Sequence, residues 1–141
     1  MKEYGSEFSE SISQTSYSYF SDLTQNVKDF AFFRSARECL FFLTKHLELK
    51  NSDSILLPAY CCDSMIDPFR KKGIDVIFYK LNKNLKPDKS YLAKQIILNK
   101  TKVVLLMNFF GIAPIQETAK FLKKKFPDLI IIEDITHSLF S

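Results

Sequence analysis

The sequence has no tryptophan, three glycines and three cysteines among its 141 residues. Two of the cysteines are adjacent, at Cys61 and Cys62, so they do not form a disulfide framework and lack the paired spacing of a zinc site. No segment approaches the roughly 18 consecutive apolar residues of a membrane span, and residues 1–18 are too polar for a signal peptide. We therefore expect a cytoplasmic protein with no bound metal and no membrane partner.

The excess of one sign of charge over the other is also small. Twenty basic and sixteen acidic side chains give a formal net charge of +4, and much of the basic excess lies in short clusters at residues 70–72 and 123–125. A nucleic-acid-binding face interleaves basic residues with exposed aromatic ones, which these clusters do not do. We expect no nucleic-acid partner. The 14 phenylalanines exceed what a small core readily buries, so part of the apolar surface is expected to contact a partner.

The hydrophobic pattern predicts an α/β fold for residues 31–141, preceded by an N-terminal arm over residues 1–30. Four short apolar runs are typical of parallel strands covered on both faces; they span residues 54–57, 75–79, 102–107 and 129–132. Segments with helical spacing lie between them or flank them, at residues 36–49, 64–72, 91–99 and 115–126. This alternation predicts three layers, with a mainly parallel sheet of about four strands flanked by helices. Gly73 suits a helix C-cap and Pro114 a helix start.

The first helix carries a candidate anion site at its start. Ser35 and Glu38 have the spacing of a capping box, which satisfies free backbone amides at a helix N-terminus. The simple interpretation is a well-capped helix. The alternative is that the amides and helix dipole, beside Arg34 and Arg37, hold a phosphate.

The end of the last strand is the most informative segment. Glu133 and Asp134 come directly after the isoleucines, and His137 lies three residues later. Alternation along a strand points the two carboxylates to opposite faces, so one can reach the crevice at the strand ends. That carboxylate could pair with a charged ring nitrogen, act as a general base, bind a metal or cap a helix. Metal binding has the least support, because Asp134 and His137 supply only two ligands.

The adjacent cysteines raise a different hypothesis. Cys61 or Cys62 with His137 as its base would form the nucleophile pair of a hydrolase. A small buried hydrophobic role is the favoured interpretation of such cysteines.

Five segments, taken in order, resemble the DegT/DnrJ/EryC1/StrS family. They are residues 33–40 (FRSARECL), 55–62 (ILLPAYCC), 73–79 (GIDVIFY), 108–111 (NFFG) and 132–138 (IEDITHS), and residues 5–8 resemble the family's N-terminal arm. Members of this family are fold-type-I aminotransferases that use pyridoxal phosphate (PLP), mostly on nucleotide-linked sugars. The resemblance implies that residues 31–141 are part of the large, PLP-binding domain.

The resemblance also implies a cofactor site made of Ser35, Ala36, Arg37, Cys62, Asn108, Asp134 and His137. The helix start would hold the phosphate, and Asp134 would keep the pyridinium nitrogen protonated so that the ring serves as an electron sink. His137 would lie near the ring and Asn108 near its hydroxyl. Cys62 falls where many members place an aromatic ring that stacks on the cofactor.

The same resemblance predicts what the chain does not carry. Family members have their Schiff-base lysine well beyond the aspartate, and no lysine here matches it, so these 141 residues are expected not to transaminate alone. Our leading hypothesis is the cofactor-cradling N-terminal part of a sugar aminotransferase-like protein, truncated or continued elsewhere, with a small-molecule sugar substrate and a homo-oligomeric assembly. The alternative is a non-catalytic α/β binding or assembly module that has kept the fold.

Overall fold

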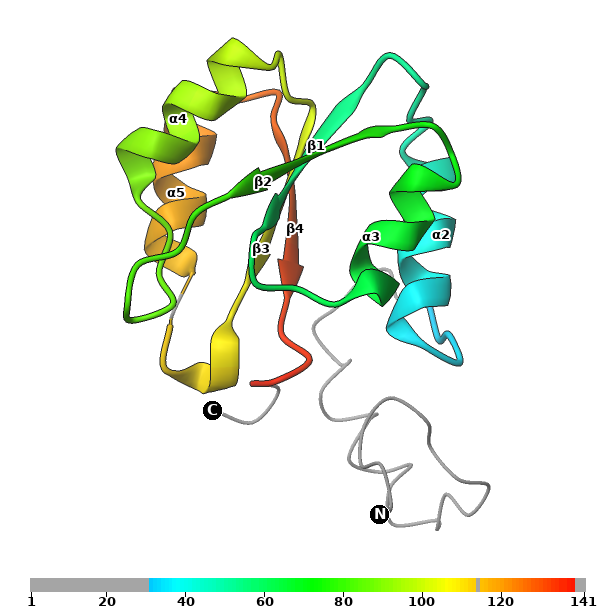
Figure 1. The fold of residues 1–141 in the computed structure, drawn as a ribbon, viewed down its shortest axis with the longest axis horizontal. Helices are drawn as coiled ribbons and strands as arrows, with labels where there is room; N and C mark the ends of the chain where they lie inside the picture. The colour runs from blue at the N-terminus through cyan, green and yellow to red at the C-terminus, as the bar shows by residue number, and fades with distance from the viewer. Residues whose placement is uncertain (1–30, 114, 139–141) are drawn as a thin grey trace, which may run out of the picture.

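The computed structural model describes residues 31–113 and 115–138, which form one parallel sheet flanked by helices (Figure 1). The strands are β1 (Ser54–Pro58), β2 (Asp75–Tyr79), β3 (Val103–Met107) and β4 (Ile130–Asp134), in the order β2-β1-β3-β4 and all parallel. The helices are α2 (Ala36–His46), α3 (Asp63–Arg70), α4 (Lys89–Leu98) and α5 (Gln116–Lys125), with a short 3-10 helix, η1 (Phe109–Gly111). The predicted α/β class is confirmed. The predicted arm and Pro114 lie outside the described residues.

Side-chain alternation along the central strands divides the interior into two cores. Ile55 and Leu57 of β1 pack with α2 and α3, whereas Leu56 packs with α4 and α5 on the opposite face. Side chains of β3 alternate in the same way, with Leu105 in the first core and Leu106 in the second. Figure 1 shows the helix pairs on opposite sides of the sheet. Every residue of β1 and β3 is buried, because helices cover both faces of these strands.

The edge strands depart from the expected pattern. The apolar runs predict burial on both faces for all four strands, but Asp75 and Phe78 of β2 are exposed, and Ile131 of β4 is only half-buried. The helices extend over the sheet centre and leave part of each edge uncovered. The prediction of full burial is therefore correct for the central pair and wrong for the edges.

Gly73 ends α3 as predicted. Its φ of +70° is left-handed, and its N–H donates to the Arg70 carbonyl at 2.9 Å. The Ile74 N–H donates to the Phe69 carbonyl at 3.1 Å, which completes the hydrogen-bond pair of a Schellman motif. A Cβ at position 73 would lie 3.1 Å from Cγ of Asn51, so a side chain would also be crowded there.

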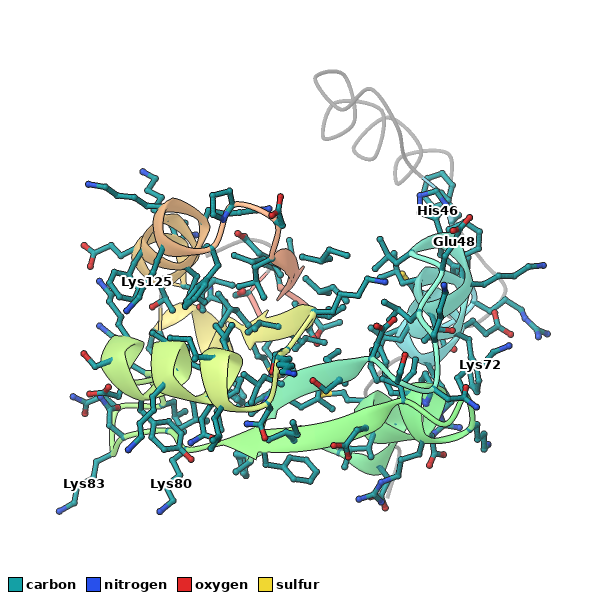
Figure 2. The ribbon with its side chains drawn as sticks, turned by 90° about the horizontal axis from the view of Figure 1, so that it is seen from above. His46, Glu48, Lys72, Lys80, Lys83 and Lys125 are labelled. Carbon is teal, nitrogen blue, oxygen red and sulfur yellow. The ribbon has the colours of Figure 1, made fainter. Side chains whose placement is uncertain are left out.

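Basic side chains are spread over separate parts of the surface. Lys72 lies just after α3, whereas Lys80 and Lys83 lie after β2 on the other side of the sheet and Lys125 ends α5 (Figure 2). Within the described residues, no helix is long and apolar enough to cross a bilayer.

A buried tyrosine ties an edge strand to the sheet centre. Tyr79, the last residue of β2, is 1% exposed, and its hydroxyl donates to the Leu105 carbonyl of β3 at 2.9 Å. Strand β1 lies between β2 and β3, so this bond crosses a neighbouring strand. Burial of the phenol raises the pKa of Tyr79 well above its usual range.

Replacing Tyr79 with phenylalanine should lower the free energy of unfolding at pH 7 by about 1 kcal/mol, because the Leu105 carbonyl loses a buried partner. The raised pKa adds a pH dependence. Above pH ~10 the unfolded chain releases the phenolic proton while the folded chain retains it, so stability falls as pH rises. Urea titrations from pH 7 to 11 should show a steeper alkaline loss in the wild type than in Tyr79→Phe. Equal slopes in the two proteins would contradict this role.

Candidate functional site

A pocket of about 680 Å³ lies where the carboxyl ends of the strands meet the starts of α2 and α3. We call it the strand-end pocket. Four residues predicted from the sequence line it: Ala36, Cys62, Asp134 and His137. These residues come from α2, the start of α3, β4 and the segment after β4, so the fold brings together positions from both ends of the described chain. Ser35, Arg37 and Asn108 are not among the lining residues.

Asp134 places a carboxylate in this pocket. Ile130 and Ile132 of β4 pack toward the core under α2 and α3, and Asp134 continues that face, whereas Glu133 is exposed. The sequence prediction that the two carboxylates diverge is therefore confirmed. The Thr136 amide donates to Oδ1 of Asp134 at 3.0 Å, and the Thr136 hydroxyl bonds the same oxygen. Within the described residues, Oδ2 makes no hydrogen bond, so one oxygen is fixed and the other is available to a ligand.

The start of α2 supplies hydrogen-bond donors. Ser35 caps the helix, and its hydroxyl accepts from the Glu38 amide at 3.3 Å. The N–H groups of Ala36 and Arg37 precede the first intrahelical bond, and in the described part of the chain neither has an acceptor. Ala36 at this helix start and Asp134 line the same pocket. Burial and then the charge of Asp134 raise the pKa of Cys39, one turn into α2.

The second half of the predicted capping box differs from expectation. The Glu38 carboxylate accepts from the backbone amide of Arg34 at 3.3 Å instead of returning to Ser35. It also pairs with the Arg34 guanidinium at 2.6 Å, and the hydrogen bond from that side chain lowers the pKa of Glu38. The pair neutralises Arg34. An anion at this helix start would therefore depend on the backbone amides more than on Arg34.

The thiols do not form a nucleophile pair with histidine. Sγ of Cys62 lies 2.7 Å from Oγ of Ser64, and burial raises the pKa of the Cys61 thiol, which opposes thiolate formation. His137 instead stacks on Phe110, with ring centroids 5.0 Å apart. No hydrogen bond between either cysteine and His137 is present in the described structure, so the geometry does not favour the hydrolase alternative.

Asn108 lies just after β3 without facing the pocket. Its backbone amide donates to the Asp134 carbonyl at 2.9 Å, which extends the pairing of β3 with β4. The residue is only 8% exposed, and its side-chain Oδ1 has no partner within the described structure. Its predicted place near a ring hydroxyl stays a prediction, whereas its backbone holds Asp134 in register.

The sequence pattern assigned no role to the aromatic part of the wall. Tyr60, Phe109 and Phe110 line the pocket, and Tyr60 packs on Phe109 with ring centroids 5.7 Å apart. Their common signal is position, because each lies just after a buried parallel strand.

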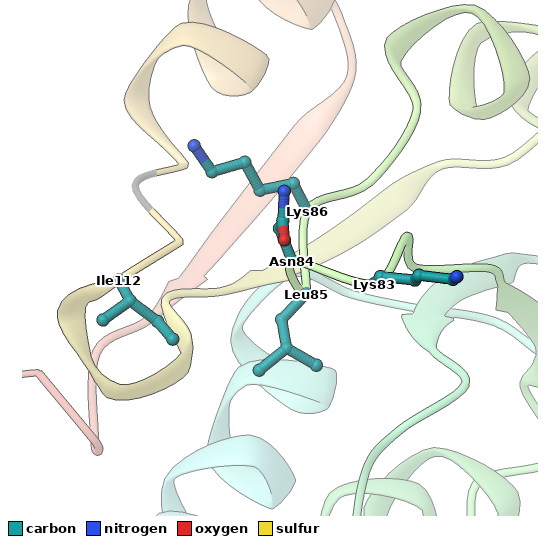
Figure 3. Close-up of a pocket in the computed structure, with 5 residues that line it drawn as sticks. All are labelled: Lys83, Asn84, Leu85, Lys86 and Ile112. Carbon is teal, nitrogen blue, oxygen red and sulfur yellow. The ribbon is translucent and has the colours of Figure 1, made fainter.

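A second hollow, of about 400 Å³, lies apart from these residues (Figure 3). Its lining residues are Lys83, Asn84, Leu85, Lys86 and Ile112. They include no carboxylate and no pair of a nucleophile with a general base. The chemistry-bearing side chains gather in the strand-end pocket instead. Within the described residues, no group of three His, Cys, Asp or Glu side chains could hold a metal ion.

Comparison with solved structures identifies the fold. Spr1654 from Streptococcus pneumoniae, described as a sugar aminotransferase and solved in its PLP form, is 20% identical over 74% of this chain, with a TM-score of 0.63. DesV from S. venezuelae is 16% identical over 70% of the chain, with a TM-score of 0.60. A PLP-bound C-S lyase from Staphylococcus hominis is 15% identical over 89%, with a TM-score of 0.64.

The chain has the fold of fold-type-I aminotransferases. Its structural neighbours include Spr1654, described as a sugar aminotransferase, and the aminotransferase TlmJ from Streptoalloteichus hindustanus, whereas no family profile matches the sequence. The chain spans 26%, 30% and 36% of the lengths of DesV, Spr1654 and the C-S lyase respectively. The likeness therefore concerns a part of each of those proteins.

Replacing Ser35 with alanine should destabilise the chain by about 1 kcal/mol, because α2 loses the acceptor that caps it. Ser35→Asp restores a hydrogen-bond acceptor, and its negative charge is favourable at the positive end of the helix dipole. This variant should recover most of the lost stability. Urea unfolding followed by circular dichroism measures both effects. Asp88→Ala is a matched control, because Asp88 caps α4 through the Tyr91 amide and does not line the strand-end pocket. A Ser35→Ala protein as stable as the wild type would contradict the capping role.

Proposed function

We propose that this chain is the cofactor-cradling part of a PLP-dependent sugar aminotransferase-like protein. The observation that carries the proposal is one pocket lined by Ala36 at the start of α2 and by Asp134 and His137 at and beyond the end of β4. Fold-type-I neighbours solved with PLP or its amine form support the cofactor class. Four of the seven residues that the resemblance implies, Ala36, Cys62, Asp134 and His137, line this pocket, which supports the proposal.

The residues present fit the two charged ends of PLP. The amides of Ala36 and Arg37, which have no acceptor among the described residues, suit a phosphate group together with the α2 dipole. Oδ2 of Asp134, which makes no hydrogen bond within residues 31–113 and 115–138, suits a protonated ring nitrogen, because a carboxylate accepts a charge-assisted hydrogen bond. PLP, when bound, supplies an electron sink for chemistry at the substrate's amine-bearing carbon.

The chain's own residues have distinct tasks in this proposal. Asp134 holds the proton on the ring nitrogen, and Thr136 fixes the carboxylate by bonding its other oxygen. Ser35 keeps the first turn of α2 formed, so that the next two amides stay directed at the phosphate. Cys62 and His137 complete the wall of the pocket. Asn108 would reach the ring hydroxyl only if its side chain turned toward the pocket.

For the whole protein we propose amino transfer to a nucleotide-linked keto sugar within a homo-oligomer. The likeness to Spr1654, described as a sugar aminotransferase, supports the substrate class. Exposed aromatic side chains, such as Phe33 beside α2 and Phe78 of β2, support an assembly that covers them. The expectation that these 141 residues do not transaminate alone stays a prediction. A stable dimer that ignores PLP would favour the alternative of a non-catalytic module.

Cofactor binding is tested with PLP and with pyridoxamine phosphate, whose amine does not react with surface lysines. We expect saturable binding of both by the wild-type chain, with a change in cofactor absorbance. Asp134→Asn should weaken binding about tenfold or more, because the ring nitrogen loses a charged partner. Equilibrium dialysis gives the dissociation constants.

Glu133→Gln is the matched control, because Glu133 is adjacent in sequence but exposed and absent from the pocket wall. It removes the same charge and should leave affinity unchanged. The proposal fails if the wild type shows no saturable binding, or if Asp134→Asn and Glu133→Gln behave alike.

A further inference from the structure

Phe110 is an exposed aromatic residue with one well-defined partner. It lies in η1, shortly after β3, and 55% of its surface is exposed. Its ring lies almost parallel to that of His137, at an interplanar angle of 9° and a centroid distance of 5.0 Å. Both residues line the strand-end pocket with Asp134. The stack therefore forms part of the candidate site.

The backbone at Phe110 is unfavourable for a residue with a side chain. Its φ of +54° is in the left-handed region, and Gly111, the next residue, is also left-handed, with φ of +72°. Glycine adopts this conformation without steric cost, whereas phenylalanine does not. Burial does not explain the phenylalanine, because more than half of it is exposed. The Phe110 ring instead provides the stacking contact with His137.

We propose that Phe110 is a positioning residue that fixes the plane of the His137 imidazole at the pocket wall. An imidazole on a segment after the last strand would otherwise rotate about its side-chain bonds. Stacking occupies one face of the ring and leaves both nitrogens at its edge, where they can donate or accept. The consequence for PLP rests on the proposed function, whereas the stack itself does not.

The second histidine provides an internal control. The chain has two histidines, and His46 also stacks on a phenylalanine, Phe42, at 5.4 Å and 15°. Both residues of that pair belong to α2, and neither lines the strand-end pocket. A substitution at Phe42 therefore removes a similar stack away from the candidate site.

The test measures the imidazole proton signals of both histidines by NMR in the 141-residue chain without cofactor. Phe110→Leu should remove the upfield ring-current shift of His137 and leave His46 unchanged, and Phe42→Leu should do the reverse. Phe110→Tyr should retain the His137 shift. Phe110→Gly, which relieves the left-handed backbone, serves as a second variant in which steric strain at this position is absent. A His137 signal that is the same in the wild type, Phe110→Leu and Phe110→Gly overturns the proposal.

The same variants are then titrated with pyridoxamine phosphate. Phe110→Leu and Phe110→Gly should weaken binding about two- to tenfold, the range expected for one aromatic pair, with wild-type affinity in Phe110→Tyr and Phe42→Leu. Unchanged affinity in variants that have lost the His137 shift overturns the positioning role. Absence of binding in the wild type overturns the proposed function and the cofactor role of Phe110, even where the His137 signals show the stack.

Discussion

The parallel pairing of β1 and β3, buried on both faces, is the constraint on which the rest of this structure depends. Parallel strands end at the same edge of a sheet, so the segments that leave neighbouring strands come together there. Residues after β1, β3 and β4 meet in this way around one pocket. Register completes the arrangement, because Met107 pairs with Asp134 and the Asn108 amide holds the Asp134 carbonyl. The position of the carboxylate thus depends on backbone pairing before any side chain contributes.

Much of the fold is predictable because local rules and tertiary packing agree. The strand Asp75–Tyr79 has the bounds that its apolar run predicts, and the Gly73 turn has the left-handed backbone that its residue type favours. Divergence of Glu133 and Asp134 results from the two-residue period of a strand. Exposure of the sheet edges was not predictable, because an apolar run does not specify how far the neighbouring helices extend.

The candidate site is also predictable in part. The family resemblance predicts Ala36, Cys62, Asp134 and His137 as site residues, and all four line the strand-end pocket. The contact partners of individual side chains are less predictable. Glu38 bonds Arg34 in place of the Ser35 amide, and His137 stacks on Phe110, since both choices depend on rotamers that the sequence pattern does not specify. The backbone of Asn108 pairs with Asp134, whereas the role expected of its side chain stays a prediction.

The hydroxyl of Tyr79 also affects how the sheet opens. A strand at an edge ordinarily frays first, because it is paired on one side only. Here the last residue of β2 is bonded to a carbonyl two strands away, at the centre of the sheet. Detaching the end of β2 therefore breaks a bond to β3 as well as those to β1. We therefore expect the amide protons at the carboxyl end of β2 to exchange together with those of β1, and not earlier as at a fraying edge.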